Sequence, residues 1–278
     1  MIVKRFSVVL LSCILAAPAL AVSPWLPTVG GHELGVSYIN QSADRFYVGK
    51  DEMNLPTDLK LRSFQLSYAY GLSERWALDV LVGYADSDFL VDPGLAPRGG
   101  LNGITDTRIG LRWLAFEQDE DRPFTLTLAG AVLIKGDYDT GAITAIGDGA
   151  NGIELSVITG RSFDSGFVWQ SELGYRLRDD EVANEWFFNR TLSYVFSDAL
   201  SGRLGWNSVD SRGNLDIGGP GFSPARFPAL EEDYHLGLVG VSIAPNEHWS
   251  LGFDYGRKFD GRNTARSDVF AFGLSRGF

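Results

Sequence analysis

The chain has 278 residues, and its 35 acidic side chains outnumber its 24 basic ones, giving a formal net charge of −11. This acidic balance excludes binding to nucleic acid through phosphate contacts, which needs a basic surface. The mean hydropathy of −0.02 is too low for a bundle of membrane helices, and beyond the first 21 residues no stretch approaches the ~20 apolar residues that one membrane helix needs.

Residues 1–21 have the pattern of a secretory signal peptide. A basic start precedes a mostly apolar run over 6–15, and a small-x-small site ends at Ala21, after which cleavage is expected. Lipoprotein processing at Cys13 is the alternative, but the apolar run continues past this residue. Cleavage after Ala21 would leave one barrel domain, 22–278, without a cysteine and therefore without an internal disulfide.

After this leader, apolar residues recur at every second position in short stretches that are separated by turn signals. In one stretch Phe64, Leu66 and Tyr68 alternate with small or polar residues, and only residues 73–75 separate it from the next stretch. A period of two residues indicates β-strands with one apolar face. The pattern predicts twelve strands, at residues 32–41, 59–72, 76–86, 104–116, 124–136, 151–163, 167–178, 185–196, 200–208, 233–243, 249–258 and 267–278.

The predicted connections alternate in length along the chain. Short turns such as 73–75 and 197–199 alternate with longer connections, several of them rich in Gly, Pro, Asp and Asn. An even number of strands, with short turns at one end and long loops at the other, is typical of bacterial outer-membrane barrels. We therefore expect an all-β fold, a transmembrane antiparallel up-and-down β-barrel of about 12 strands. The longer connections are predicted at 42–58, 87–103, 137–150, 179–184, 209–232 and 259–266.

The last predicted strand has the pattern of a terminal outer-membrane strand. Phe270, Phe272 and Leu274 share one face with Phe278, while the opposite face is small or polar. We expect it to contact outer-membrane lipid and lipopolysaccharide of a diderm bacterium, and to be recognised by the barrel-assembly machinery. The long loops would then lie outside and both termini in the periplasm. A soluble β-sandwich or lipocalin-like barrel is the alternative, but such a fold would bury the aromatic face of its strands.

The polar face of the predicted strands carries charge of both signs. Unpaired charge in a narrow lumen is costly, so we expect these side chains to pair across neighbouring strands. Two interpretations stay open: a charged constriction that selects solutes, or an ion-pair network that fills and stiffens the barrel. The candidate lumen-lining residues are Asp79, Arg108, Arg112, Lys135, Glu154, Glu172, Arg176, Arg203 and Asp254.

Five segments carry a resemblance to a known family. They are the start at 23–30 (Ser-Pro-Trp-Leu-Pro-Thr-Val-Gly), residues 34–38 (Leu-Gly-Val-Ser-Tyr), residues 44–47 (Asp-Arg-Phe-Tyr), the turn at 70–78 (Tyr-Gly-Leu-Ser-Glu-Arg-Trp-Ala-Leu) and residues 104–113 (Ile-Thr-Asp-Thr-Arg-Ile-Gly-Leu-Arg-Trp). The chain resembles the outer-membrane barrel family named for the MetA-pathway of phenol degradation, best over about residues 24–116. This resemblance implies an outer-membrane protein that transports small, often aromatic molecules. It brings no functional residues with it.

The function that we expect is passive passage of a small molecule, including hydrophobic or aromatic ones, without catalysis, cofactor or metal. Two alternatives stay open. One is an outer-membrane hydrolase with an outer-rim Asp/His site, for which Asp233 and His235 have the spacing and Asp86 and Asp88 could supply further acids. The other is a closed structural or adhesive barrel.

Overall fold

The computed structural model describes residues 22–89, 100–140, 143–147, 149–179 and 181–278. The predicted signal peptide, 1–21, lies outside these described residues. The described residues form thirteen strands and one short 3-10 helix: β1 (His32–Val48), β2 (Asp51–Ser73), β3 (Trp76–Asp88), β4 (Asn102–Ile104), β5 (Thr107–Phe116), β6 (Thr125–Ile134), β7 (Gly152–Ser162), β8 (Phe167–Arg178), β9 (Glu185–Ser197), β10 (Leu200–Ser211), η1 (Pro224–Ala229), β11 (Asp233–Asn246), β12 (Trp249–Arg262) and β13 (Asp268–Gly277).

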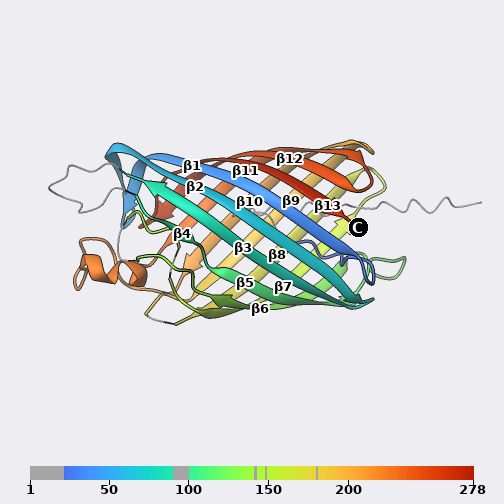
Figure 1. Ribbon diagram of the computed structural model, residues 1–278, viewed down its shortest axis with the longest axis horizontal. Coiled ribbons are helices and arrows are strands. Elements are labelled where there is room, and N and C mark those ends of the chain that lie inside the picture. Colours follow the sequence, from blue (N-terminus) through green and yellow to red (C-terminus); the bar gives the residue numbers. More distant parts are fainter. Residues whose placement is uncertain (1–21, 90–99, 141–142, 148, 180) are drawn as a thin grey trace, which may run out of the picture.

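These strands close into a single barrel, with every pairing antiparallel (Figure 1). Each long strand pairs with the next one along the chain, and β13 pairs with β1 to complete the ring. The three-residue β4 pairs with β3 beside β5, so that the two together occupy one of the barrel's 12 strand positions. The predicted fold class is therefore confirmed. No helix in the described ranges is long and apolar enough to cross a membrane.

Side chains alternate between the two faces of the wall, as the sequence pattern predicts. Phe64 on β2 is 57% exposed and Tyr84 on β3 is 48% exposed, whereas Ala69 and Ala77 on the same strands are fully buried. The exposed face is thus apolar and aromatic, and the buried face is small or polar. This is the sidedness of a wall with lipid outside, and it is the reverse of a soluble barrel.

The seam between β13 and β1 follows the same rule. Phe270 and Phe272 lie 55% and 41% exposed on the outer face, while Val269 and Ala271 between them are buried inside. At the end of the seam the Phe278 backbone N–H donates to the His32 carbonyl oxygen at 2.9 Å. The strand predicted from the alternation at 267–278 is confirmed and forms the closing contact of the barrel.

The predicted connection at 42–58 is wrong, because strand structure continues through most of it. β1 extends to Val48 and β2 begins at Asp51, with a tight turn at Gly49, whose φ of +58° suits glycine. A register shift between Ala43 and Arg45 resets the alternation, so the two-residue period is lost in the sequence although the pairing continues. The hairpin therefore extends beyond the rest of the wall at the end where η1 lies (Figure 1).

The predicted strand at 104–116 is also wrong at its start, since the wall is interrupted between β4 and β5. Asp106 lies in this break and accepts hydrogen bonds from the Gly136 backbone N–H at 3.0 Å and from the Tyr138 hydroxyl at 2.5 Å. The carboxylate thus binds the connection after β6 instead of continuing the strand. A side-chain acceptor of this kind competes with ladder pairing, which explains the interruption.

The connection between β10 and β11 is held by a polar cluster at its base. Arg262 donates to both carboxylate oxygens of Asp216, at 2.7 and 2.8 Å, and Asn263 donates to Asp216 at 2.8 Å and to the Glu231 carbonyl at 2.8 Å. The hydrogen bonds from Arg262 lower the pKa of Asp216 from 3.8 to about 2. This cluster fixes the segment that carries η1 against the end of β12.

Candidate functional site

The first buried charge pair in the barrel joins β3 to β5. The guanidinium of Arg112 donates to both carboxylate oxygens of Asp79, at 2.7 and 2.8 Å. Arg112 is only 1% exposed, so its charge is almost fully removed from water. A two-point contact of this geometry offsets the cost of burying both ions.

A second charge cluster crosses β5, β7, β8 and β9. Glu154 accepts from Arg108 at 2.9 Å and from Arg176 at 2.7 Å, and Arg176 also donates to Glu185 at 2.5 Å. Two arginines therefore meet two carboxylates in one chain of ion pairs. Glu185 is absent from the residues predicted from sequence, although it lies directly opposite Arg176 in the register of β8 and β9.

Glu172 on β8 lies beside this cluster but is bound differently. It is 2% exposed, and one carboxylate oxygen accepts from the Ser156 hydroxyl at 2.9 Å. The other accepts from the Asn189 side-chain amide at 3.0 Å. Both of these donors are neutral, whereas Asp79 and Glu154 each bind an arginine.

A third ion pair bridges β10 and β12 across the intervening β11. Arg203 donates to the two carboxylate oxygens of Asp254 at 2.7 and 2.6 Å, and also to Ser242. The contact passes over Gly240 of β11, where a Cβ atom would lie 2.0 Å from Asp254 Oδ1. Glycine at this position leaves the room that the pair needs.

Lys135, the remaining candidate lumen-lining residue, lies outside these charge clusters. It follows the end of β6 and is exposed, and its backbone N–H donates to the Asn151 side chain at 3.1 Å. The structure thus brings Asp79 to Arg112, Glu154 to two arginines, and Arg203 to Asp254, but it places Lys135 at the loop end of the wall. The alternation fails for Lys135 because β6 ends one residue before it.

The N-terminal segment, residues 22–31, reaches into the barrel and binds its inner wall through backbone groups. The sequence pattern does not predict this. The guanidinium of Arg112 donates to the carbonyl oxygens of Ser23 at 2.7 Å and Trp25 at 3.1 Å. The Thr127 hydroxyl donates to the Pro24 carbonyl at 2.6 Å. The backbone N–H of Val22 donates to Glu172 at 3.2 Å. This segment has no two-residue period, so no sequence pattern placed it inside.

Glycines in the wall make room for this segment. A Cβ on Gly71 would lie 2.1 Å from the Thr28 carbonyl oxygen, and one on Gly160 would lie 2.4 Å from the Pro24 ring. Gly71 also exchanges backbone hydrogen bonds with the segment, accepting from Gly30 at 2.8 Å and donating to Gly31 at 3.0 Å. The wall and the segment are therefore matched in shape as well as in polarity.

One part of the inner wall is apolar. The inward residues of β1, β11 and β13 form one buried cluster, the apolar strip, composed of Ile39, Leu236, Leu238, Val269 and Ala271. The Arg203–Asp254 pair lies beside this strip, with Asp254 directly opposite Ala271 in the register of β12 and β13. The other charge pairs lie on β3, β5, β7, β8 and β9. The interior thus combines an apolar cluster with ions that are largely paired.

Asp233 and His235, the pair of the hydrolase alternative, have separate contacts. The His235 ring lies 5.7 Å from Trp206 and 6.1 Å from Phe259, both of which are more than 40% exposed on the outer face. Asp233 accepts instead from the Ser211 backbone N–H at 2.8 Å. Within the described ranges no group of three His, Cys, Asp or Glu side chains is arranged to hold a metal ion.

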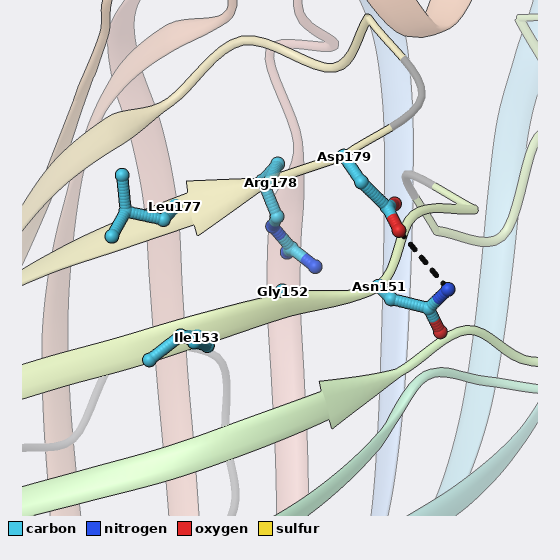
Figure 2. A pocket seen from close by; sticks show the side chains of 6 residues that line it. All are labelled: Asn151, Gly152, Ile153, Leu177, Arg178 and Asp179. Atoms are coloured by element: carbon cyan, nitrogen blue, oxygen red, sulfur yellow. Dashed lines mark hydrogen bonds between the residues drawn. The ribbon is translucent and has the colours of Figure 1, made fainter.

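A shallow hollow lies at the ends of β7 and β8, where Ile153 and Leu177 form its apolar side (Figure 2). Asn151 donates to Asp179 at 3.1 Å across its mouth, and Arg178 lies between the two strands. Arg178 also forms an ion pair with Asp106 at 3.6 Å. The hollow therefore belongs to the contacts that hold the loop end of the wall together.

Solved structures of low sequence identity share this architecture. The COG4313 outer membrane channel from Pseudomonas putida F1 superposes with a TM-score of 0.76 at 13% identity, covering 92% of this chain and 98% of that one. The NanC porin gives a TM-score of 0.53 at 8% identity, covering 87% and 98%. The translocator domain of the autotransporter NalP from Neisseria meningitidis gives 0.52 at 10% identity, covering 90% and 89%. These likenesses concern the fold.

Sequence comparison is more specific. No curated protein sequence matches the chain. Residues 52–274, which span β2 to β13, match the sequence pattern of a family, and this match covers most of the chain and extends beyond the region of resemblance noted above. The chain therefore belongs to the family described as "Putative MetA-pathway of phenol degradation".

Proposed function

We propose that this outer-membrane barrel is a passive channel for small, uncharged and partly apolar molecules. The observation that carries the proposal is the pairing of the charges inside the barrel. Arg108, Arg112, Arg176 and Arg203 are each paired with carboxylates, so the field that they leave in the lumen is weak and selects little for ions of either sign. The apolar strip, whose side chains pack against one another, adds no charge to this interior.

Two further findings support this proposal. The family is named for the degradation of an aromatic compound, and the P. putida F1 structure of the same fold is described as an outer membrane channel. Passage along a concentration difference needs no cofactor and no catalytic group. The N-terminal segment narrows the interior, which favours small solutes over large ones.

The orientation that we propose places the long loops outside the cell and both termini in the periplasm. Short turns on the periplasmic side and long loops outside are the rule for this class of barrel. The exposed aromatic face of β13, with Phe278 at 59% exposure, supports contact with lipid and recognition by the barrel-assembly machinery. We further propose that the loop ends contact lipopolysaccharide.

The direct test is uptake of a labelled small aromatic alcohol by cells that express the protein. Intact cells are needed because the lipopolysaccharide leaflet slows apolar solutes, which cross simple lipid vesicles unaided. We expect uptake at least several-fold above cells with an empty vector, and a return toward that level for Leu238→Asp, which places an unpaired charge in the apolar strip. Ala199→Asp, in the exposed turn after β9, is the matched control. Uptake equal to the empty vector would favour a closed structural or adhesive barrel.

A further inference from the structure

We propose that removal of the leader after Ala21 creates an α-ammonium group at Val22 that pairs with the Glu172 carboxylate and fastens the N-terminal segment inside the barrel. The proposal rests on the predicted cleavage site and on the contacts of Val22 and Glu172. It does not depend on which solute passes, or on whether any does.

The position of the Val22 nitrogen is the first observation. It lies 3.2 Å from Glu172 Oε2, at the inner end of the N-terminal segment. The carbonyl oxygens of the next three residues hold the segment in this position. Those of Ser23 and Trp25 accept from Arg112, and that of Pro24 accepts from the Thr127 hydroxyl. The nitrogen is therefore held in place by its neighbours and does not depend on Glu172 alone.

The second observation is the environment of Glu172. It is 2% exposed, and its side-chain donors are the hydroxyl of Ser156 and the amide of Asn189, both neutral. The charged side chains that act on it electrostatically are Glu154 on β7 and Arg108 on β5, and Arg108 is bound to Glu154 at 2.9 Å. Among the described residues, no lysine, arginine or histidine forms an ion pair with Glu172.

Ionising a buried carboxylate costs much free energy when only neutral groups donate to it. A neighbouring cation reduces this cost. The other buried carboxylates of this wall, Asp79, Glu154 and Asp254, each accept hydrogen bonds from an arginine. Glu172 lacks an arginine at the place where the Val22 nitrogen lies. An ammonium group there would supply the missing charge.

Cleavage is the step that makes this cation. Water adds across the Ala21–Val22 peptide bond, so that the leader departs with the Ala21 carboxylate and Val22 keeps the amine. An α-amine has a pKa of about 8 and takes up a proton at neutral pH. The single N–H of the amide is thereby replaced by three donors that carry a positive charge.

The first experiment identifies the mature N-terminus and its reactivity. The full chain is expressed in a diderm host, purified from the outer membrane and sequenced from its N-terminus, which we expect to be Val22. The α-amine is then labelled by reductive methylation in the folded barrel and in heat-unfolded protein. We expect labelling to be at least tenfold slower in the folded barrel. A different first residue, or equal labelling rates in the two states, would overturn the proposal.

The second experiment separates charge from shape. Glu172→Gln keeps the size and one acceptor oxygen but removes the charge, and should raise the labelling rate of the folded protein at least fivefold. Glu172→Asp keeps the charge and should retain most of the protection. Glu120→Gln, in the exposed turn between β5 and β6, is the control and should label as the wild type does. Equal labelling of Glu172→Gln and wild type would overturn the proposal.

A third variant covers the case in which Glu172→Gln does not fold. One alanine inserted between Ala21 and Val22 leaves every wall residue intact but moves the ammonium by about 3.8 Å along the chain. We expect this mature chain to lose protection as Glu172→Gln does. If labelling of the amine stays as slow as in the wild type, burial of the segment alone shields the amine, and the proposed ion pair is wrong.

Discussion

At the scale of single residues, the interior is organised by what each buried ion needs. Arg112 donates two hydrogen bonds to Asp79 from two of its nitrogens, and its third nitrogen donates to the carbonyl oxygens of Ser23 and Trp25. One side chain therefore joins the wall to the N-terminal segment. Replacing Arg112 should lower both the stability of the barrel and the order of that segment.

Arg112→Met should lower the free energy of unfolding by about 3–5 kcal/mol, because it leaves the Asp79 carboxylate buried without its partner. The measurement is urea-induced unfolding of the barrel in lipid vesicles. Arg122→Met is the control, since Arg122 is exposed in a turn and its pair with Asp119 is 3.6 Å long, and it should cost less than about 1 kcal/mol. Equal losses in the two variants would contradict the assigned role of the pair.

A second residue-scale prediction concerns the close approach of Gly71 to Thr28. Gly71→Ala places a Cβ 2.1 Å from a backbone oxygen that cannot move without displacing the N-terminal segment. We expect a loss of about 1–3 kcal/mol in the same unfolding measurement. Gly130→Ala is the matched control, because the nearest atom to its Cβ is a leucine methyl at 3.4 Å. If the two variants lose the same stability, the segment does not lie against Gly71.

Sequence alternation predicted the face of these residues but not their partners. Parity places Arg203 and Asp254 on the same face, yet they lie on strands separated by β11, and their contact depends on how far each strand is shifted along the barrel. Glu185 is not among the predicted residues because it is the first residue of β9, and a single residue at the end of a strand shows no alternation. The register between strands decides which ions meet, and the alternation within one strand does not reveal that register.

At the scale of elements, the departures from the predicted boundaries have local causes. The sequence pattern predicts a loop where the β1–β2 hairpin lies, because the irregularity between Ala43 and Arg45 shifts the phase of the alternation. The strand predicted from residue 104 is cut by Asp106, which binds Gly136 and Tyr138 instead of extending the ladder. Most other strands follow the period closely, because lipid on one side leaves little freedom in which residues face outward.

The loop base at Asp216 gives a prediction about pH. Because Arg262 holds the pKa of Asp216 at about 2, below its ordinary 3.8, the carboxylate stabilises the folded loop fully above about pH 4 and progressively less as the pH falls toward 2. Pepsin, which is active over this range, should cut the 212–232 connection of wild type only toward pH 2. Asp216→Asn should be cut already at pH 4. A wild-type loop cut equally fast at both pH values would contradict this account.

At the scale of the whole molecule, the barrel is a closed wall whose interior is partly filled by its own N-terminal segment. Deletion of residues 22–28, which spares the contacts of Gly30 and Gly31 with Gly71, should widen the lumen and raise the single-channel conductance in planar bilayers several-fold. Deletion of residues 119–121 from an exposed turn is the control and should leave conductance unchanged. An unchanged conductance after the first deletion would mean that the segment does not limit passage.

The antiparallel contact of β1 with β13 has a consequence for how the protein is made. Strands that begin near residue 32 and residue 268 must meet, so the ring cannot be completed until nearly the whole sequence has been secreted. Until then two ladders of backbone amides and carbonyls would be open, and hydrocarbon offers them no hydrogen bonds. Insertion should therefore proceed as one concerted event, and a chain lacking Asp268–Gly277 should accumulate in the periplasm as a substrate for proteases.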